Sequence, residues 1–397
     1  MNTTAVLEGT ARKPSIWATG LAMFAMFFGA GNIVFPIALG QFTQDKNLYG
    51  MLGMIITAVL VPLMGLLAMM LYEGDYNAFF RRIGKLPGFT VILLILGLIG
   101  PFAGIPRCIT ISYSTLTAFG LEGFSGMNLA SFSVISCVVI FLFSYRPNKI
   151  LPLLGFVLTP ILLLSLALIV IKGALSMPAA MTSLSTRWET FSYGLVGGYN
   201  TMDLLAAFFF SSVVLLCLQN GQKSSFQTDR RLLSVAVFAS FIAATLLALV
   251  YVGFSYLAAG YSSTLASVAN HQMLGVLAYK LLGPSAGLVA GVAVTFACLT
   301  TEIALTVVFS GFLQKTICRE KISYPVALGI TLFVTFGISI LHFEGIAAFV
   351  APILQVCYPA LIVLAVVNIL HKLYAFKPVK SLFYGTFITS LVLGLLK

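Results

Sequence analysis

The chain has 397 residues, of which 60% are hydrophobic and only 8% are charged, with a formal net charge of +11 and a mean hydropathy of +1.06. Soluble domains carry about 25% charged residues, so this composition excludes a soluble globular protein and predicts an all-α protein that crosses a membrane several times. An excess of positive charge is also typical of nucleic-acid binding, but the distribution of the basic residues favours another explanation, given below.

Apolar runs long enough to cross a bilayer follow one another along the whole chain. A spanning helix needs about 20 apolar residues. Runs of that kind predict eleven spans: 15–40, 48–72, 89–119, 127–145, 149–171, 191–218, 231–259, 284–312, 323–341, 345–370 and 380–396. No soluble domain separates from them, so we interpret residues 1–397 as one transmembrane domain. The first run has no small-residue cleavage site behind it, so it is a span and not a signal peptide.

The first span contains the segment MFFGAGNIVFP, residues 26–36. Four residues that do not favour a continuous helix stand in a row there: Gly29, Ala30, Gly31 and Asn32. Irregular backbone at membrane depth is tolerated only where it is buried in protein or lines a water-filled cavity. We therefore predict an unwound segment at residues 29–32. A single glycine in a membrane helix more often serves close helix packing.

The third span, 89–119, carries Arg107 directly after Pro106. A charged residue inside a membrane costs on the order of 3 kcal/mol on insertion scales and marks a functional site by default. We interpret Arg107 as a member of a structural ion pair and not as a substrate contact, because unwound backbone amides hold a carboxylate without it.

The defect of the first span recurs in the sixth, where residues 195–203 read LVGGYNTMD. The residues that correspond to the first break are Gly197, Gly198, Tyr199 and Asn200. Matched breaks in two halves of a chain predict an inverted-repeat transporter with its binding site at the bilayer midplane. The second half starts five spans after the first, so the halves, 15–172 and 191–370, are expected to be inverted in the membrane, with 380–396 as an extra C-terminal helix.

Two facing breaks suit a dipolar solute. Unwinding frees amide N–H groups at the start of the second half-helix, which attract an anion, and carbonyl groups at the end of the first half-helix, which attract a cation. An amino acid carries a carboxylate and an ammonium group on one carbon. The two breaks are therefore predicted to hold these two groups and to leave the side chain to an apolar surrounding.

Two acidic residues lie within later spans. Asp203 follows the second break, either as a carboxylate favoured by a helix N-terminus or as a gate or electrostatic partner. Glu302 follows Thr300 and Thr301 in the eighth span. It is either a proton-coupling carboxylate, since burial favours its protonated form, or the partner that neutralises Arg107, which we favour. For Thr300 and Thr301 the ordinary role is a hydrogen bond from the hydroxyl to the carbonyl four residues earlier, as is usual for threonine in a membrane helix.

The longest interruption between spans is residues 260–283, whose second half has apolar residues at helical spacing. This predicts a short amphipathic helix on the surface, either a lid over a vestibule or a plain connector.

Most Lys and Arg residues fall on the side of the membrane that holds the N-terminus, which places the N-terminus in the cytoplasm and the C-terminus outside. The positive charge is thus a topology signal, and no nucleic-acid partner is expected. The six cysteines show no metal-ligand spacing, and we interpret them as packing residues.

Four segments resemble the branched-chain amino acid:cation symporter family: FAMFFGAGNIVFP (24–36), IGPFAGIPR (99–107), LVGGYNTMD (195–203) and ACLTTEIAL (297–305). The resemblance runs through essentially the whole chain. It implies the LeuT-type fold with five-plus-five inverted repeats, a place in the bacterial inner membrane, and sodium-coupled import of leucine, isoleucine and valine. Members usually have twelve spans, one more than the number predicted here.

The resemblance also implies residue roles. Amides near Gly29, Ala30 and Gly31 would hold the substrate carboxylate, and Gly197, Gly198 and Tyr199 would meet its ammonium group and side chain, with Asn32 and Asn200 completing the two breaks. Sodium, a hard cation suited to oxygen ligands, would be held by five residues: Ala25, Phe28, Ala297, Thr300 and Thr301. Arg107, Asp203 and Glu302 would serve gating or coupling.

Other functions remain as alternatives. The nearest is proton-coupled or sodium-independent transport of hydrophobic amino acids such as methionine. A channel needs a continuous polar lining, whereas the polar residues here concentrate at the two breaks. An enzyme needs an acid, base or nucleophile set, which the sequence does not show. We expect no cofactor besides sodium, and the lipid bilayer and an amino acid as the partners.

Overall fold

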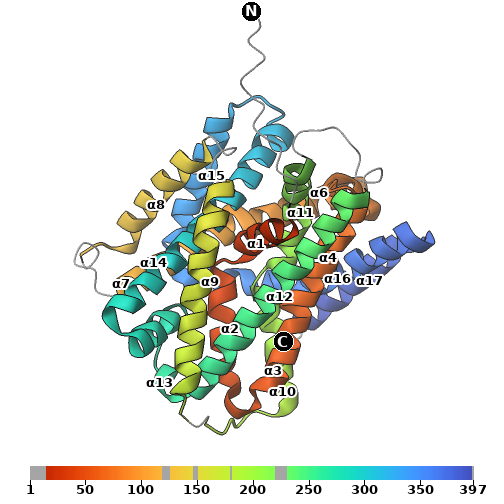
Figure 1. Ribbon diagram of the computed structural model, residues 1–397. Coiled ribbons are helices and arrows are strands. Elements are labelled where there is room, and N and C mark those ends of the chain that lie inside the picture. Colours follow the sequence, from red (N-terminus) through yellow and green to blue (C-terminus); the bar gives the residue numbers. More distant parts are fainter. Residues whose placement is uncertain (1–14, 119–125, 146–150, 179–180, 220–229, 396–397) are drawn as a thin grey trace, which may run out of the picture.

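The structure is a computed structural model that describes residues 15–118, 126–145, 151–178, 181–219 and 230–395. The elements of these residues are all helices, as predicted. In Figure 1 the long helices α9 and α12 run beside one another, and the short helix α1 packs against both. Several of the basic residues on which the predicted topology rests, those of segments 1–14, 146–150 and 220–229, lie outside the described residues.

The described residues of the first half form nine α-helices and several shorter helical elements. They are α1 (Ile16–Phe27), α2 (Ala30–Thr43), η1 (Gln44–Lys46), α3 (Asn47–Ile55), η2 (Ile56–Leu60), α4 (Val61–Leu71), α5 (Tyr76–Phe80), η3 (Arg81–Ile83), α6 (Lys85–Gly97), η4 (Leu98–Phe102), α7 (Gly104–Ala118), α8 (Leu129–Ser144) and, as the helix that completes this half, α9 (Leu151–Leu175).

The second half contains longer helices. They are α10 (Arg187–Asn200), α11 (Asp203–Gln219), α12 (Arg230–Gly260), α13 (Ser262–Leu265), η6 (Asn270–Gln272), α14 (Met273–Phe312), η7 (Leu313–Ile317), α15 (Tyr324–Ser339), α16 (His342–Tyr374) and α17 (Val379–Leu395). Each predicted span overlaps one of these helices or a pair of them, which is consistent with eleven spans.

The first span is interrupted between α1 and α2, as predicted. The break lies at residues 28 and 29, whereas the expected segment was 29–32. Phe28 and Gly29 have extended backbone angles, with ψ of 93° and −162°. The prediction that residues 29–32 are all unwound is wrong, because Asn32 caps the second half-helix: its side-chain oxygen accepts a hydrogen bond from the Gly29 amide at 2.9 Å. Such a cap satisfies an amide that would otherwise lack a partner and lets the helix begin at Ala30.

The sixth span is interrupted between α10 and α11, at Thr201 and Met202. Met202 has a positive φ of 63°, a conformation that non-glycine side chains rarely adopt. The predicted break at 197–200 is therefore wrong in position, because those residues complete α10. Gly198 packs tightly against Thr57 and Ala58 of η2, whereas Gly197 has more room, as described below.

Two further helices bend within the membrane. The third span has a non-helical residue, Gly100 (φ −89°, ψ −121°), just before α7. The helix α14 contains Gly283 with φ 76° and ψ −179°, which separates residues 273–282 from the long span that follows. The short surface helix predicted in the second half of 260–283 is thus present.

Glycines allow α10 to cross α3 at close range. A methyl group on Gly194 would lie 1.9 Å from the carbonyl oxygen of Gly50, and one on Gly198 would lie 1.9 Å from the Thr57 hydroxyl oxygen. The Thr57 hydroxyl also donates to the Leu195 carbonyl at 2.9 Å. Small residues that let two backbones approach are typical of helix contacts in membranes, where lipid tails offer no hydrophobic driving force for association.

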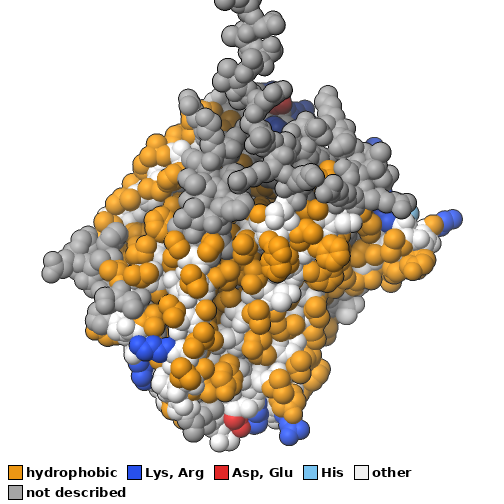
Figure 2. Space-filling view, in the orientation of Figure 1, with side chains coloured by type: hydrophobic (Ala, Val, Ile, Leu, Met, Phe, Trp, Pro, Cys, Tyr) orange, Lys and Arg blue, Asp and Glu red, His pale blue; other side chains and the backbone are white. Residues whose placement is uncertain are grey.

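The surface fits a bilayer. Figure 2 shows a broad band of hydrophobic side chains across the visible face, with Lys and Arg side chains near the ends of the molecule. The described residues contain six helical stretches long and apolar enough to cross a membrane, together with five shorter apolar helices. Many large apolar side chains are exposed on the helices, among them Leu142, Leu164 and Phe333. An apolar belt of this extent is stable against lipid and not against water.

Candidate functional site

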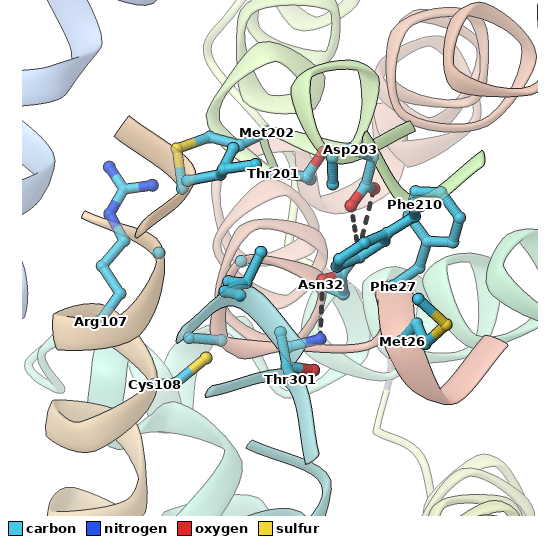
Figure 3. A pocket seen from close by; sticks show the side chains of 17 residues that line it. Met26, Phe27, Asn32, Arg107, Cys108, Thr201, Met202, Asp203, Phe210 and Thr301 are labelled. Atoms are coloured by element: carbon cyan, nitrogen blue, oxygen red, sulfur yellow. Dashed lines mark hydrogen bonds between the residues drawn. The ribbon is translucent and has the colours of Figure 1, made fainter. Parts of the chain in front are cut away.

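A cavity lies where the two interrupted spans meet. Figure 3 shows it between α7, on which Arg107 and Cys108 lie, and the segment with Thr201, Met202 and Asp203. Residues of both breaks and of α14 line it: Met26, Phe27, Gly29, Ala30, Gly31, Asn32, Ile99, Gly104, Arg107, Cys108, Thr201, Met202, Asp203, Ala206, Phe210, Thr301 and Leu305. Its volume of about 40 Å³ is small beside the roughly 300–1,000 Å³ of small-molecule pockets, so a ligand must widen it.

A hydrogen-bond network joins the two breaks. Asn32 donates from its side-chain nitrogen to both carboxylate oxygens of Asp203, at 2.9 Å each. Tyr251 of α12 donates its hydroxyl to the same carboxylate at 2.7 Å and also contacts the Asn32 nitrogen. All three side chains are buried. Because Asn32 also caps the first break through Gly29, this network holds the geometry of one break to that of the other.

The two breaks differ in what their backbone amides meet. At the second break, the Leu204 amide faces the hydroxyl of Tyr358 on α16 at 3.3 Å. At the first break, the Ala30 amide faces the Cys108 thiol, and Gly31 lies on the cavity wall. The first amides of a helix have no partner within the helix, and a helix N-terminus attracts an anion. The N-terminus of α2 is therefore the end of the cavity whose chemistry suits an anion.

Oxygen atoms gather beside the first break, around Thr301 of α14. The Thr301 hydroxyl oxygen lies 3.4 Å from the Ala25 carbonyl oxygen, 3.2 Å from that of Phe28 and 3.3 Å from that of Ala297. The Thr300 hydroxyl donates to the Ala297 carbonyl at 2.7 Å.

This oxygen cluster suits a cation. A threonine hydroxyl has one proton to donate, so it satisfies only one of the three carbonyl groups around Thr301. The cluster thus contains more acceptors than donors. Neutral oxygen ligands of this kind fit a hard cation. The five residues predicted as sodium ligands from the family resemblance are the residues that the structure brings together here.

Arg107 is buried with little compensation. Its side chain is 1% exposed and donates one hydrogen bond, from Nη1 to the Asn200 carbonyl at 3.0 Å. The guanidinium carbon lies 5.7 Å from the ring centres of both Phe35 and Phe343, and Nε and Nη2 have no hydrogen-bond partner. Arg107 therefore ties α7 to α2, α10 and α16 through a carbonyl and two aromatic faces, an arrangement of cation–π type.

The predicted pairing of Arg107 with Glu302 is wrong. Neither side chain forms an ion pair among the described residues, and the Glu302 Oε1 atom is buried without a hydrogen-bond partner. Arg107 instead meets the Asn200 carbonyl and the rings of Phe35 and Phe343.

The glycines predicted in the second break have a packing role. Gly197 and Gly198 are both buried: a methyl group on Gly197 would meet the end of the Met54 side chain on α3, and one on Gly198 would meet Thr57 on η2. Neither residue lines the cavity. Tyr199 packs its ring against Tyr358, with 4.7 Å between the ring centres, and Asn200 contributes the carbonyl that Arg107 binds. The helix is interrupted at Thr201 and Met202 instead.

Sequence reasoning missed Tyr251 and Tyr358. Both rings are fully buried. The Tyr251 hydroxyl donates to the Asp203 carboxylate, and the Tyr358 hydroxyl accepts from the Leu204 amide. Each tyrosine stands in an apolar helix, where a buried hydroxyl needs a partner. That need indicates a polar neighbour, but the neighbour comes from a different helix, which one sequence does not identify.

The comparisons of this sequence with known proteins all indicate one family of transport proteins. A family model described as "Branched-chain amino acid transport protein" matches residues 12–397. The branched-chain amino acid permease BraB of Bacillus subtilis (strain 168) is 31% identical over 364 residues, covering 89% of this chain and 80% of its own. The permease BrnQ of Corynebacterium glutamicum is 28% identical over 363 residues, covering 91% and 82%.

Solved structures share the fold at low sequence identity. MhsT in complex with L-phenylalanine superposes with a TM-score of 0.63 at 16% identity, covering 96% of this chain and 98% of its own. A Na⁺-coupled sialic acid symporter gives a TM-score of 0.57 at 12% identity, covering 97% and 90%. These similarities confirm the predicted fold class, an all-helical membrane protein of the LeuT type with discontinuous first and sixth spans.

Proposed function

The chain belongs to the branched-chain amino acid transport protein family, and from this premise we propose that it imports leucine, isoleucine and valine by sodium-coupled alternating access. It is a membrane transport protein and not an enzyme by family. The observation that carries the sodium assignment is the cluster of carbonyl oxygens around Thr301, directly beside the cavity. The sodium ion is a co-transported substrate in this proposal.

The substrate carboxylate is held at the N-terminus of α2, near Gly31 and Asn32, where the helix presents amide groups to the cavity. The ammonium group faces the Asp203 carboxylate, which accepts hydrogen bonds from Asn32 and Tyr251 and keeps further acceptor capacity. The aliphatic side chain lies among apolar residues of the lining: Phe27, Ile99, Phe210 and Leu305. A branched aliphatic chain gains free energy by leaving water for such a surface.

Sodium and substrate are coupled through the first break. Gly29 lies next to Thr301, since a methyl group on Gly29 would be 3.2 Å from the Thr301 methyl carbon. A cation bound by Ala25, Phe28 and Thr301 fixes the end of α1 and thereby the start of α2. Because binding free energies are linked, sodium raises substrate affinity by the factor by which substrate raises sodium affinity.

Arg107 closes the outer side of the site. It links α7 to Phe35, Phe343 and the Asn200 carbonyl. Beyond it, His271 of η6 pairs with Glu344 of α16 and faces the Phe343 ring at 6.4 Å between ring centres. We place this side outside, with the N-terminus in the cytoplasm, the C-terminus outside, residues 15–172 and 191–370 as the inverted repeats and 380–396 as the extra helix; residue 396 lies beyond the described ranges.

Uptake by purified protein in proteoliposomes tests the proposal. We expect radioactive leucine to accumulate when an inward sodium gradient is imposed, and competing isoleucine and valine to reduce this uptake. Replacement of sodium by potassium is expected to abolish accumulation. Accumulation driven equally by an inward proton gradient without sodium contradicts the sodium proposal and supports the rival, a proton-coupled carrier of hydrophobic amino acids such as methionine. Equilibration without accumulation supports a passive pore.

A further inference from the structure

A second set of buried polar groups lies on the face of α14 next to the Thr301 cluster. Glu302 is 2% exposed, and its Oε1 atom has no hydrogen-bond partner. Three hydroxyl groups are also fully buried without partners: those of Ser133 on α8, Thr306 on α14 and Thr335 on α15. Buried polar atoms in native proteins are nearly always paired, and an unpaired group calls for an unseen water or ion.

The packing of α14 against α15 brings two of these hydroxyl groups face to face. The Ser310 hydroxyl donates to the Thr331 hydroxyl at 3.0 Å. The two helices follow each other in the chain and run antiparallel, so one turn back along α14 faces one turn forward along α15. Thr306 thus lies opposite Thr335. Glu302 lies one turn before Thr306 on the same face of α14, since residues four apart share a face of a helix.

The helix α8 completes the enclosure. The Cys137 thiol donates to the Leu332 carbonyl of α15 at 3.7 Å, and the Tyr324 hydroxyl at the start of α15 donates to the Ser144 carbonyl at the end of α8 at 3.2 Å, so the two helices run antiparallel. Ser133 lies one turn before Cys137 on α8, and Thr335 lies about one turn after Leu332 on α15. The four unpaired groups therefore converge on one place between α8, α14 and α15.

The chemistry of the convergence favours a monovalent cation. A buried carboxylate without a partner is strongly unfavourable, and Arg107 does not neutralise it. Oxygen ligands of a cation such as calcium lie about 2.4 Å from the ion. The distance between two such oxygens is longer than between two hydrogen-bonded oxygens. The absence of hydrogen bonds among these four groups agrees with this arrangement. No set of three His, Cys, Asp or Glu residues in the described part of the chain is arranged to hold a metal ion, which disfavours a transition metal.

We propose that the interface of α8, α14 and α15 binds a second monovalent cation, with the Glu302 carboxylate as the charged ligand and the hydroxyls of Ser133, Thr306 and Thr335 as neutral ligands. The identity of the ion as sodium rests on the proposed function above. Glu302 and Thr301 are adjacent in the chain, so the two cations are bound on neighbouring faces of α14. The second cation holds α14 against α8 and α15 while the first joins it to α1.

Equilibrium binding of radioactive sodium to the purified full-length protein tests this site. We expect two sodium ions per wild-type molecule, one for Glu302→Gln and one for Thr301→Val. A wild-type melting temperature in sodium-free detergent solution and elution as a single monodisperse species verify that each variant is folded. Glu320→Gln, which changes an exposed glutamate between η7 and α15, is expected to bind two ions.

A second variant keeps the test independent of the charge change. Thr306→Val preserves shape and removes one hydroxyl ligand, and it is expected to weaken the sodium affinity of one of the two sites by about tenfold. One ion per wild-type molecule, lost in Thr301→Val and retained in Glu302→Gln, overturns the second site and leaves sodium coupling intact. If wild-type protein binds no sodium, the coupling proposal fails and this assignment fails with it.

Discussion

Asp203 is the residue on which both interrupted spans depend. Its carboxylate accepts hydrogen bonds from Asn32, which caps the first break, and from Tyr251, and it lines the cavity directly after the second break. The sequence suggested either a favourable charge at a helix N-terminus or an electrostatic partner. The structure combines these roles, because the carboxylate stands at the start of α11 and faces the other half of the site.

Replacing Asp203 with asparagine is therefore expected to weaken leucine binding. The variant keeps the shape but removes the negative charge opposite the substrate ammonium group. Hydrogen bonds to charged groups contribute about 1.5–3 kcal/mol, which corresponds to a roughly 10–100-fold loss of affinity. Isothermal titration of the purified protein in saturating sodium measures the change.

Asp75→Asn is the matched control for this measurement. Asp75 is exposed and caps α5 by accepting from the Ala78 amide at 3.0 Å, a role that asparagine fills equally well. We expect unchanged leucine affinity in this variant. Wild-type affinity in folded Asp203→Asn protein would show that the ammonium group binds elsewhere.

Thr301 offers a residue-scale test of the first cation site. Thr301→Val keeps the side-chain volume and removes the hydroxyl oxygen that faces three carbonyl groups. We expect the sodium concentration for half-maximal uptake to rise about tenfold or more, since a loss of about 1.4 kcal/mol has that effect. Uptake kinetics over a range of sodium concentrations measure it.

The control lies on the same helix. The Thr295 hydroxyl bonds the Gly291 carbonyl four residues earlier, as threonines in membrane helices commonly do. Thr295→Val is expected to leave the sodium dependence unchanged. Equal sodium dependence in the two variants would remove Thr301 from the ligand set.

At the scale of elements, the crossing of α10 over α3 gives a sharp contrast between adjacent glycines. A methyl group on Gly198 would lie 1.9 Å from the Thr57 hydroxyl and 3.0 Å from the Ala58 amide nitrogen. A methyl group on Gly197 would meet only the flexible end of Met54, at 3.3 Å. Gly198→Ala is expected to destabilise the protein by about 1–3 kcal/mol, a typical cost of overpacking.

Thermal unfolding in detergent checks this expectation, with Gly197→Ala as the control that retains the wild-type melting temperature. The result also separates packing from binding. If Gly197→Ala abolishes leucine binding while the protein stays folded, the originally predicted substrate role of Gly197 is correct and the packing role assigned to it is incomplete.

The sequence predicted the helices well and the exact positions of the breaks poorly. The positions of the spans follow from the length of apolar runs, a local property that the bilayer imposes. The end of each break follows from contacts between distant segments. Asn32 starts α2 by capping Gly29, a local device that its sequence position indicates only weakly, and Arg107 of α7 binds the carbonyl that ends α10.

The same distinction applies to the site residues. Ala25, Phe28, Ala297, Thr300 and Thr301 were implied by the family resemblance, and the structure places them together. The expected pair of Arg107 and Glu302 is absent from the described residues, where Arg107 meets the Asn200 carbonyl and two phenylalanine rings. Charge balance between spans is not a property of the sequence alone, since it requires knowing which face of each helix meets which neighbour.

For the whole molecule, alternating access requires that the outer side open when Arg107 is released. Arg107→Gln removes the charge that binds the Asn200 carbonyl and the two phenylalanine rings. We expect Cys108, which lines the cavity, to react about tenfold or more faster with a membrane-impermeant thiol reagent added from outside, because the open state gains about 1.4 kcal/mol.

Labelling of right-side-out vesicles, with the modified residue identified by mass spectrometry, measures the rate. Arg187→Gln serves as the control, because Arg187 lies over the Tyr49 ring at 5.3 Å but outside the cavity. Unchanged labelling of Cys108 in Arg107→Gln would show that Arg107 does not hold the outer side closed.

The central claim is that one cation and one amino acid are bound on either side of the first break and stabilise each other. Leucine binding to the purified protein, measured at equilibrium with sodium and then with potassium at equal ionic strength, tests it most directly. The account predicts that sodium lowers the leucine dissociation constant and that leucine lowers the sodium dissociation constant by the same factor. A leucine dissociation constant that is identical in sodium and in potassium would contradict it.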